Sequence, residues 1–487
     1  MINSARWGKH LLSAGLATTM IASSFAVPAA EAVSISDSQP FPQSPGRAKE
    51  VGPKSTCDSD PIFFAYYRTW RDKAITLKDD ESPLLQPQVK LTDLPEGVNF
   101  VSLFHVPSNF KDDANFWATF KNEYHPSLKE RNIKVVRTID VSTLLKKATE
   151  KGLHGKYNDP SRGYRDAARE IYSQFVTANN LDGLDIDMED HDLHKSINKK
   201  WQLRHMMTAL SEIAGPQAIE NRGRSQNDPN YKYLIFDTPS DSEKYQVGLV
   251  ADLVDYVLVQ TYRETETPQA AWNDFRDKVN SCQFLVGYSN PEENDKTNKG
   301  QFIAGIGNPE KSGAVGRAKW QPQNGIKAGT FTYAIDRDGS TYEEPSYSRL
   351  SPTDFKFAQY AIVANDPAKF EAKKKSIESK LDSAPSTDQA AKQTLRVKIT
   401  QAPTYSALAD AEKEIDKLPQ LPETMNQQSA APAAPMNTPG TQQKHDIGTS
   451  TPGTEKKSSS SLWRILMTVT AGLMAIFGGF FAMFLRR

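Results

Sequence analysis

The sequence predicts an α/β fold, a closed barrel of eight parallel strands in which a helix follows each strand. Eight short segments with the composition of β-strands recur between residues 61 and 336, and helical segments separate them. Strands that alternate with helices indicate a parallel sheet, and eight of them suit a (β/α)8 or TIM barrel. The expected strands are residues 61–70, 98–106, 133–140, 181–190, 233–238, 256–262, 283–289 and 329–336.

The amino-terminal segment is typical of an export signal. Arg6 and Lys9 precede a long apolar run, and small residues surround a cleavage point, which predicts a signal peptide over residues 1–32. Residues 33–56 are rich in Ser, Pro and Gly and predict a flexible leader. We therefore expect an exported protein.

The chain has two cysteines, Cys57 and Cys282. This number excludes a disulfide-rich scaffold and a cysteine-rich zinc module. Both residues precede predicted strands, so they are expected at the same end of the barrel, and export would place them in an oxidising compartment. A disulfide between them is one expectation, and two unpaired thiols are the alternative.

The fourth strand carries the most informative pattern, the stretch LDGLDIDMED. Asp185, Asp187 and Glu189 alternate with apolar residues at period two, so their carboxyls lie on one face of the strand. Like charges that close cannot all ionise, and the pKa of at least one carboxyl must be raised. Glu189 is at the C-terminal end, where a barrel places its chemistry, and is the candidate general acid.

Two other interpretations of this stretch fit it less well. A solvated acidic face would not lie within an apolar segment. A calcium loop would place a glycine after its alternating acids, whereas Gly183 precedes them. His191 and His194 follow, but no third ligand has a suitable spacing for zinc, so no metal site is expected.

The spacing Asp-Gly-x-Asp-x-Asp-x-Glu, from Asp182 and Gly183 to Glu189, resembles the signature of glycoside hydrolase family 18. The resemblance implies that Glu189 protonates the glycosidic oxygen and then acts as a base, and that the substrate's own N-acetyl carbonyl is the nucleophile. It also implies that Asp187 orients the acetamido group and that Asp185 maintains the protonation state of Asp187. No cofactor is required.

Three further stretches, residues 66–72, 260–262 and 332–339, are similar to the bacterial endo-β-N-acetylglucosaminidases of this family, especially those acting on the glycan of immunoglobulin G. Tyr333 stands where chitinases of the family usually have Trp. The similarity implies that Tyr262 contacts the N-acetyl oxygen during catalysis. It implies that Gln260, Tyr67, Arg68 and Tyr333 bind substrate, although aromatic residues on strands are also ordinary core residues. Asp237 is added to this set because it falls at the carboxyl end of a predicted strand.

The expected activity is cleavage between the two core N-acetylglucosamines of N-linked glycans, on a glycoprotein such as immunoglobulin G. A chitinase and a glycan-binding surface protein with weak catalysis are the alternatives. Lys plus Arg and Asp plus Glu both number 59, so no basic excess indicates a nucleic-acid partner. We expect a monomer.

Helices should complete the chain after the barrel domain, which is assigned to residues 57–365. A helix over 352–365 closes the barrel. Residues 366–418 have periodic apolar positions, interrupted at prolines, and predict two or three packed helices. These helices either position a protein substrate or support the barrel.

The carboxy-terminal part predicts a surface anchor. Residues 419–461 are rich in Pro, Ala, Thr, Gln and Ser and predict a stalk. Residues 465–485 carry no charge and are long enough to form a transmembrane helix, and Arg486 and Arg487 follow on the expected cytoplasmic side. The protein is therefore expected at the cell surface, and cleavage of the stalk would release it.

Overall fold

The computed structural model describes residues 51–75, 82–104, 114–153, 161–190, 192–240, 244–295, 304–386 and 388–419. The predicted signal peptide, most of the predicted leader, the stalk after residue 419 and the predicted transmembrane helix lie outside these residues. Among the helices that are described, none has both the length and the apolar character needed to cross a membrane.

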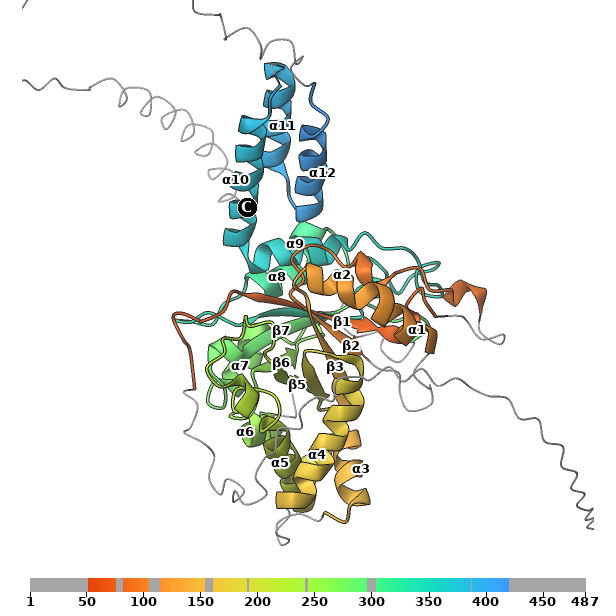
Figure 1. Ribbon diagram of the computed structural model, residues 1–487, viewed down its shortest axis with the longest axis vertical. Coiled ribbons are helices and arrows are strands. Elements are labelled where there is room, and N and C mark those ends of the chain that lie inside the picture. Colours follow the sequence, from red (N-terminus) through yellow and green to blue (C-terminus); the bar gives the residue numbers. More distant parts are fainter. Residues whose placement is uncertain are drawn as a thin grey trace, which may run out of the picture. The chain divides into compact units, whose positions relative to one another are not determined.

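Eight parallel strands close into a barrel in the order in which they occur along the chain (Figure 1). This confirms the predicted barrel, and each strand falls within or beside its expected segment. The last strand pairs with the first, so the sheet has no free edge. The strands are β1 Ile62–Arg68, β2 Phe100–Phe104, β3 Lys134–Asp140, β4 Gly183–Asp187, β5 Tyr233–Pro239, β6 Tyr256–Gln260, β7 Phe284–Ser289 and β8 Gly329–Tyr333.

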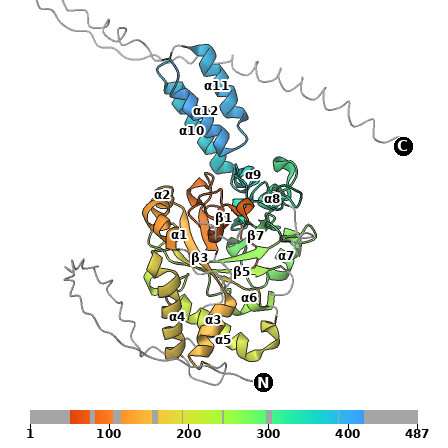
Figure 2. The same cartoon turned by 90° about the vertical axis from the view of Figure 1, so that its right-hand side faces the viewer.

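Helices surround the strands in both views (Figures 1 and 2). Their apolar sides and the outer faces of the strands form one large core. The helices of this layer are α1 Ala114–Thr119, α2 His125–Glu130, α3 Val141–Glu150, α4 Ser161–Phe175, α5 Ile197–Ser211, α6 Lys244–Val250, α7 Pro268–Phe275, α8 Gly313–Lys319 and α9 Lys356–Asn365.

Helix α9 begins four residues later than predicted. Phe355, immediately before it, has φ 55° and ψ 33°, a left-handed conformation that a right-handed helix cannot include. The buried Asp338 carboxyl accepts hydrogen bonds from the backbone N–H groups of Phe357 and Ala358, at 3.1 and 2.8 Å. These bonds satisfy donors that the first turn of a helix leaves unpaired.

A second, smaller core fills the inside of the barrel. It consists mainly of aromatic and branched side chains from alternate strand positions, as the period of two requires. Gly287 on β7 is part of this arrangement, because a Cβ there would lie 2.2 Å from the ring of Phe331 on β8. The interior is therefore packed below the carboxyl ends of the strands, and chemistry is confined to that end.

Three helices follow the barrel and lie side by side in both views (Figures 1 and 2). They are α10 Pro367–Ser383, α11 Gln389–Gln401 and α12 Tyr405–Ile415. Asp366, Asp388 and Thr404 cap their first turns with side-chain hydrogen bonds. Their buried apolar side chains, spaced at helical intervals, belong to the same core cluster as the outer layer of the barrel.

Cys57 and Cys282 form a disulfide with an S–S distance of 2.00 Å and a Cα–Cα distance of 5.5 Å. Cys57 precedes β1 and Cys282 precedes β7, so the bond lies at the amino-terminal end of the barrel. Backbone hydrogen bonds reinforce it, since Gly52 N donates to Val279 O at 3.0 Å and Ser281 N donates to Gly52 O at 3.0 Å.

Candidate active site

Asp182 and Gly183 fix the start of β4 against its neighbours. Asp182 Oδ2 accepts a hydrogen bond of 2.8 Å from the backbone N–H of Val135 on β3. A Cβ on Gly183 would lie 2.4 Å from the carbonyl oxygen of Tyr233 on β5. The motif thus begins with one residue that bonds to β3 and one that lets β5 approach, and this sets the register of the acidic residues that follow.

Asp185 points into the barrel and is fully buried. Its Oδ2 accepts hydrogen bonds from the Tyr66 hydroxyl at 2.9 Å and from Thr138 Oγ1 at 2.8 Å. Thr138 is in turn hydrogen-bonded to Ser102. Burial raises the pKa of Asp185 to about 6, although both hydroxyl donors act in the opposite direction because they favour the ionised form.

Asp187 and Asp237 are neighbours on β4 and β5, in register and on the same face. Both side chains are buried, and the Oδ1 atom of each has no hydrogen-bond partner among the described residues. Burial raises the pKa of Asp187 well above its usual value, and the adjacent Asp237 and Glu189 carboxyls add to the effect. The pKa of Asp237 is also well above normal, first through burial and then through Asp185.

Glu189 lies just beyond the end of β4 and is the exposed member of the acidic row. Gln260, at the end of β6, donates from Nε2 to Glu189 Oε1 at 3.1 Å and to Asp237 Oδ2 at 2.9 Å. The structure therefore brings Asp185, Asp187, Glu189, Asp237 and Gln260 together at the carboxyl ends of three adjacent strands. The exposed carboxyl of Glu189 thus lies next to three buried carboxyls.

Aromatic side chains border this cluster on the β8 side. The rings of Tyr262 and Tyr333 have centroids 6.1 Å apart and planes inclined by 28°. Phe104, which the sequence analysis did not single out, meets Tyr333 edge to face at 5.4 Å. The hydroxyl of Tyr333 donates to Glu292 Oε1 at 2.6 Å. Flat rings next to an exposed carboxyl suit a sugar, whose faces are apolar and whose rim is polar.

A model of the TIM-barrel domain of the endo-β-N-acetylglucosaminidase EndoS matches residues 65–332. The chain belongs to this family. The match spans β1 to β8 and includes every predicted catalytic and substrate-binding residue except Tyr333, which lies one position beyond it. The acidic row, Gln260 and Tyr262 all lie within the matched residues.

Several relatives carry the same activity in their names. The chain is 30% identical over 309 residues to the endo-β-N-acetylglucosaminidase EndoSd of Streptococcus dysgalactiae, covering 59% of this chain and 34% of that protein. It is 30% identical over 278 residues to endo-β-N-acetylglucosaminidase F2 of Elizabethkingia meningoseptica, covering 57% and 73%. The chain thus spans about a third of the length of EndoSd.

Among solved structures, the chain is similar to the endo-β-N-acetylglucosaminidase of Cordyceps militaris. The sequences are 29% identical, the TM-score is 0.51, and the similarity covers 63% of this chain and 92% of that one. The same enzyme was also solved as a variant in which an aspartate and a glutamate two positions apart are replaced by their amides, in complex with fucosyl-N-acetylglucosamine-Asn.

Tyr67, predicted to bind substrate, lies elsewhere in this EndoS-type barrel. Tyr66 and Arg68 point inward, so Tyr67 between them points outward into the helix layer. It is fully buried, and its hydroxyl lies 2.7 Å from Asp72 Oδ2 and 2.9 Å from the carbonyl oxygen of Val89. The stretch that resembles the endoglycosidases thus contributes Tyr66 rather than Tyr67 to the acidic cluster.

Arg68, also predicted to bind substrate, is 1% exposed and held within a charged network. Its Nη2 donates to Asp336 Oδ2 at 2.7 Å and its Nη1 to Glu293 Oε2 at 2.9 Å. A weaker contact of 3.4 Å reaches Glu292, the partner of Tyr333. Arg68 therefore does not face the cluster directly but helps to hold Glu292, and through it Tyr333, in place. Glu292 and Glu293 were not predicted as site residues, although they follow the seventh strand and so lie at the end of the barrel where the site was expected.

Within the described part of the chain, no cluster of three or more His, Cys, Asp or Glu side chains could hold a metal ion. His194 is exposed, and His191 lies outside the described residues.

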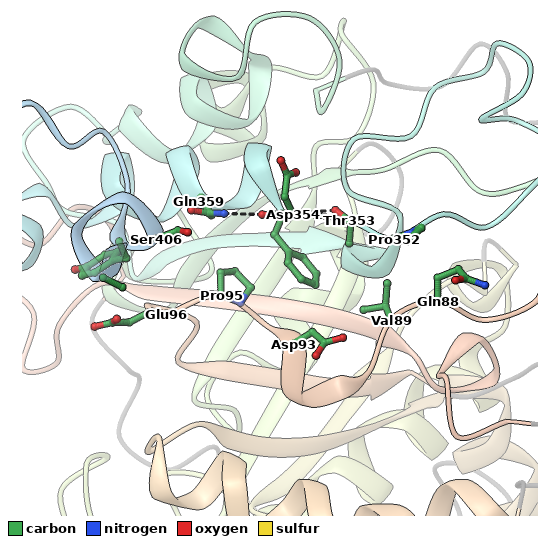
Figure 3. A pocket seen from close by; sticks show the side chains of 13 residues that line it. Gln88, Val89, Asp93, Pro95, Glu96, Pro352, Thr353, Asp354, Gln359 and Ser406 are labelled. Carbon is green, nitrogen blue, oxygen red and sulfur yellow. Dashed lines mark hydrogen bonds between the residues drawn. The ribbon is translucent and has the colours of Figure 1, made fainter. Parts of the chain in front are cut away.

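A further cavity has a volume of about 480 Å³ (Figure 3). Its lining comes from the segment between β1 and β2, from the residues just before α9 and its first turn, and from α12, and it includes Asp93, Glu96 and Asp354. None of the predicted site residues lines it, so the cavity is separate from the candidate site.

Proposed function

We propose that this protein hydrolyses the β-1,4 bond between the two core N-acetylglucosamines of N-linked glycans, with retention of configuration. The observation that carries the proposal is the exposed Glu189 carboxyl at the end of a row whose inner members, Asp187 and Asp185, are buried. The family match and the names of the relatives support the same activity.

Glu189 is the proton donor in this scheme. It is the exposed member of the row, so it can reach the glycosidic oxygen, and its Oε1 accepts an N–H of Gln260. That hydrogen bond favours the carboxylate that remains once the proton has left. The carboxylate then takes a proton from the attacking water in the second step, as microscopic reversibility requires.

Asp187 is placed to act on the acetamido group of the substrate. In the absence of substrate its pKa is raised by burial and by neighbouring carboxyls. Closure of the N-acetyl oxygen onto C1 creates a positive charge, and a cation beside the carboxyls lowers their pKa. The buried acids therefore stabilise the cyclic intermediate more strongly than the ground state, which is the requirement for catalysis.

The spacing seen in the Cordyceps militaris variant agrees with this assignment. The aspartate and glutamate replaced there are two positions apart, as are Asp187 and Glu189. Tyr262 beside the row is the proposed partner of the N-acetyl oxygen, and Tyr333 the proposed wall of the sugar subsite.

We also propose an exported location, with residues 465–485 as a membrane anchor and immunoglobulin G as a candidate substrate glycoprotein. The apolar runs near both ends of the sequence support export and anchoring. The Cys57–Cys282 disulfide supports an oxidising compartment. Membrane fractionation before and after treatment with detergent tests the anchor.

The test of the activity compares the full chain with its Glu189→Gln variant on native immunoglobulin G, by intact mass of the heavy chain. We expect loss of the glycan down to one N-acetylglucosamine, and a rate at least about 10²-fold lower for Glu189→Gln. Glu130→Gln, on the exposed face of α2, is the control and should match the parent. Cleavage of chito-oligosaccharides alone would favour a chitinase, and binding without turnover would favour a glycan-binding protein.

A further inference from the structure

Gln260 lies between Glu189 and Asp237 and is hydrogen-bonded to both. Its Nε2 atom donates to Glu189 Oε1 at 3.1 Å and to Asp237 Oδ2 at 2.9 Å. An amide nitrogen carries two hydrogens, so both donors are used. The amide oxygen is left as the polar atom of Gln260 that is available to a ligand.

Asp237 is poorly placed to contact substrate itself. Its side chain is 2% exposed, and Oδ2 is occupied by Gln260. Among the described residues, no Lys or Arg forms an ion pair with it, and a buried carboxylate without a cation is costly. Burial, and then Asp185, raise the pKa of Asp237 well above its usual value. The titratable groups that face it are Asp185, Asp187 and Glu189 from β4 and its extension, Tyr66 from β1 and Tyr262 just after β6.

We propose that Asp237 is a positioning residue that orients Gln260 for the acid Glu189. By accepting one N–H of the amide, it turns the other N–H toward Glu189 and leaves the amide oxygen for the sugar. This inference rests on the proposed function, because it gives Gln260 a role in the proton transfer from Glu189.

The orientation of the amide decides which form of Glu189 it stabilises. An N–H directed at Glu189 favours the carboxylate and so assists release of the proton, whereas an amide oxygen in the same place favours the protonated acid. Without Asp237, the amide loses the acceptor that distinguishes its two orientations. Proton transfer should then become slower while sugar binding is largely kept.

The test is kinetic and uses the full chain. Asp237→Ala should lower kcat by about 10- to 100-fold, the scale expected when a group in the site is misplaced, with KM within about threefold. Asp237→Asn should keep kcat within about threefold, because its side-chain oxygen accepts the same hydrogen bond.

A double-mutant cycle tests whether Asp237 acts through Gln260. Asp237→Ala should add nothing to Gln260→Ala, because the two changes remove one shared function. Gln202→Ala, a buried amide on α5 outside the site, is the control and should leave kcat unchanged. A parent-like kcat in Asp237→Ala, equal losses in Asp237→Asn and Asp237→Ala, or additive effects with Gln260→Ala would each overturn the proposal.

Crystal structures of the parent and of Asp237→Ala give a readout that needs no activity. We expect the Nε2 of Gln260 to leave Glu189 in the variant, and an unchanged distance of about 3.1 Å would refute the positioning role. A parent that cleaves no glycan would defeat the proposed function, while these structures would still decide the role of Asp237.

Discussion

Tyr66 and Asp185 are joined by a buried hydrogen bond of 2.9 Å from the tyrosine hydroxyl to Oδ2. Tyr66 lies on β1 and Asp185 on β4, so the bond crosses the inside of the barrel. Thr138 donates to the same oxygen from β3. Both donors favour the charged form of Asp185, which burial opposes by raising its pKa to about 6. Asp185 therefore receives two side-chain hydrogen bonds, whereas Asp237 in the same cluster receives one.

Tyr66→Phe should move the pH dependence of catalysis. Loss of one donor raises the pKa of Asp185, so the acidic limb of kcat/KM should shift to higher pH by roughly one unit, with kcat reduced by about tenfold. The measurement is a pH profile with a glycopeptide substrate. Tyr164→Phe is the matched control, because Tyr164 is equally buried and its hydroxyl has no hydrogen-bond partner within the part of the chain that the structure describes. Identical profiles for both variants would show that Tyr66 does not act on Asp185.

Gly183→Ala should destabilise the fold strongly. The new Cβ would lie 2.4 Å from a backbone oxygen of β5, and neither strand can move without disturbing the barrel. We expect a loss of about 3 kcal/mol or more in the free energy of unfolding, as for other overpacked buried sites. Urea unfolding measures it. Gly316→Ala on α8 meets nothing within 4 Å and should be neutral or stabilising. Equal stability of the two variants would contradict the close approach at Gly183.

Glu293→Gln should make the fold less sensitive to acid. Burial acts to raise the pKa of Glu293, but Arg68 and Arg71 outweigh it and hold the pKa at about 2. Because this is below the value for an unfolded chain, the ion pairs stabilise the fold above about pH 4.5, and their contribution is lost as the pH falls toward 2.

The stability difference between parent and Glu293→Gln should therefore be large at pH 7, about 3 kcal/mol, and shrink as the pH falls from 4.5 toward 2. Urea unfolding across this range tests it. Glu170→Gln, which removes an exposed carboxyl with surface ion pairs, should change stability little at any pH. A difference that stays constant with pH would show that Glu293 is not the titrating group.

Replacement of both Cys57 and Cys282 by Ser should lower stability by about 2 to 5 kcal/mol, since the bond closes a long loop in the unfolded chain. Dithiothreitol should destabilise the parent by a similar amount and leave the double variant unchanged. Thermal unfolding with and without the reductant measures both effects. Two free thiols in the parent, detected by alkylation and mass, would rule the bond out.

Period and composition predicted much of the fold. Each of the eight strands is a short apolar segment, and the alternation around Asp185 and Asp187 placed both carboxyls on the inner face. The same rule, applied one residue at a time, would have separated Tyr66 from Tyr67. Tyr67 was instead predicted from the similarity of residues 66–72 to the endoglycosidases. Similarity of sequence does not by itself show on which face of a strand a side chain lies.

The supporting network around Arg68 could not be predicted from local patterns. Its partners Glu293 and Asp336 come from two other strand ends, more than two hundred residues away along the chain, and no periodicity links them. The late start of α9 could not be predicted from the sequence either, because it depends on the left-handed backbone conformation of Phe355. Both features depend on residues that are distant in sequence and meet only in the folded protein, so a local sequence pattern does not predict them.

The bond between Cys57 and Cys282 also makes the chain from β1 to β6 part of a covalent ring. A protease that cuts once within this ring opens a loop but releases no fragment, because the two pieces remain joined through sulfur. A cut after Cys282, for example before β8, separates the polypeptide at once. The first six strands thus stay covalently joined after one cut within the ring, whereas any strand beyond a cut after Cys282 is held by packing alone.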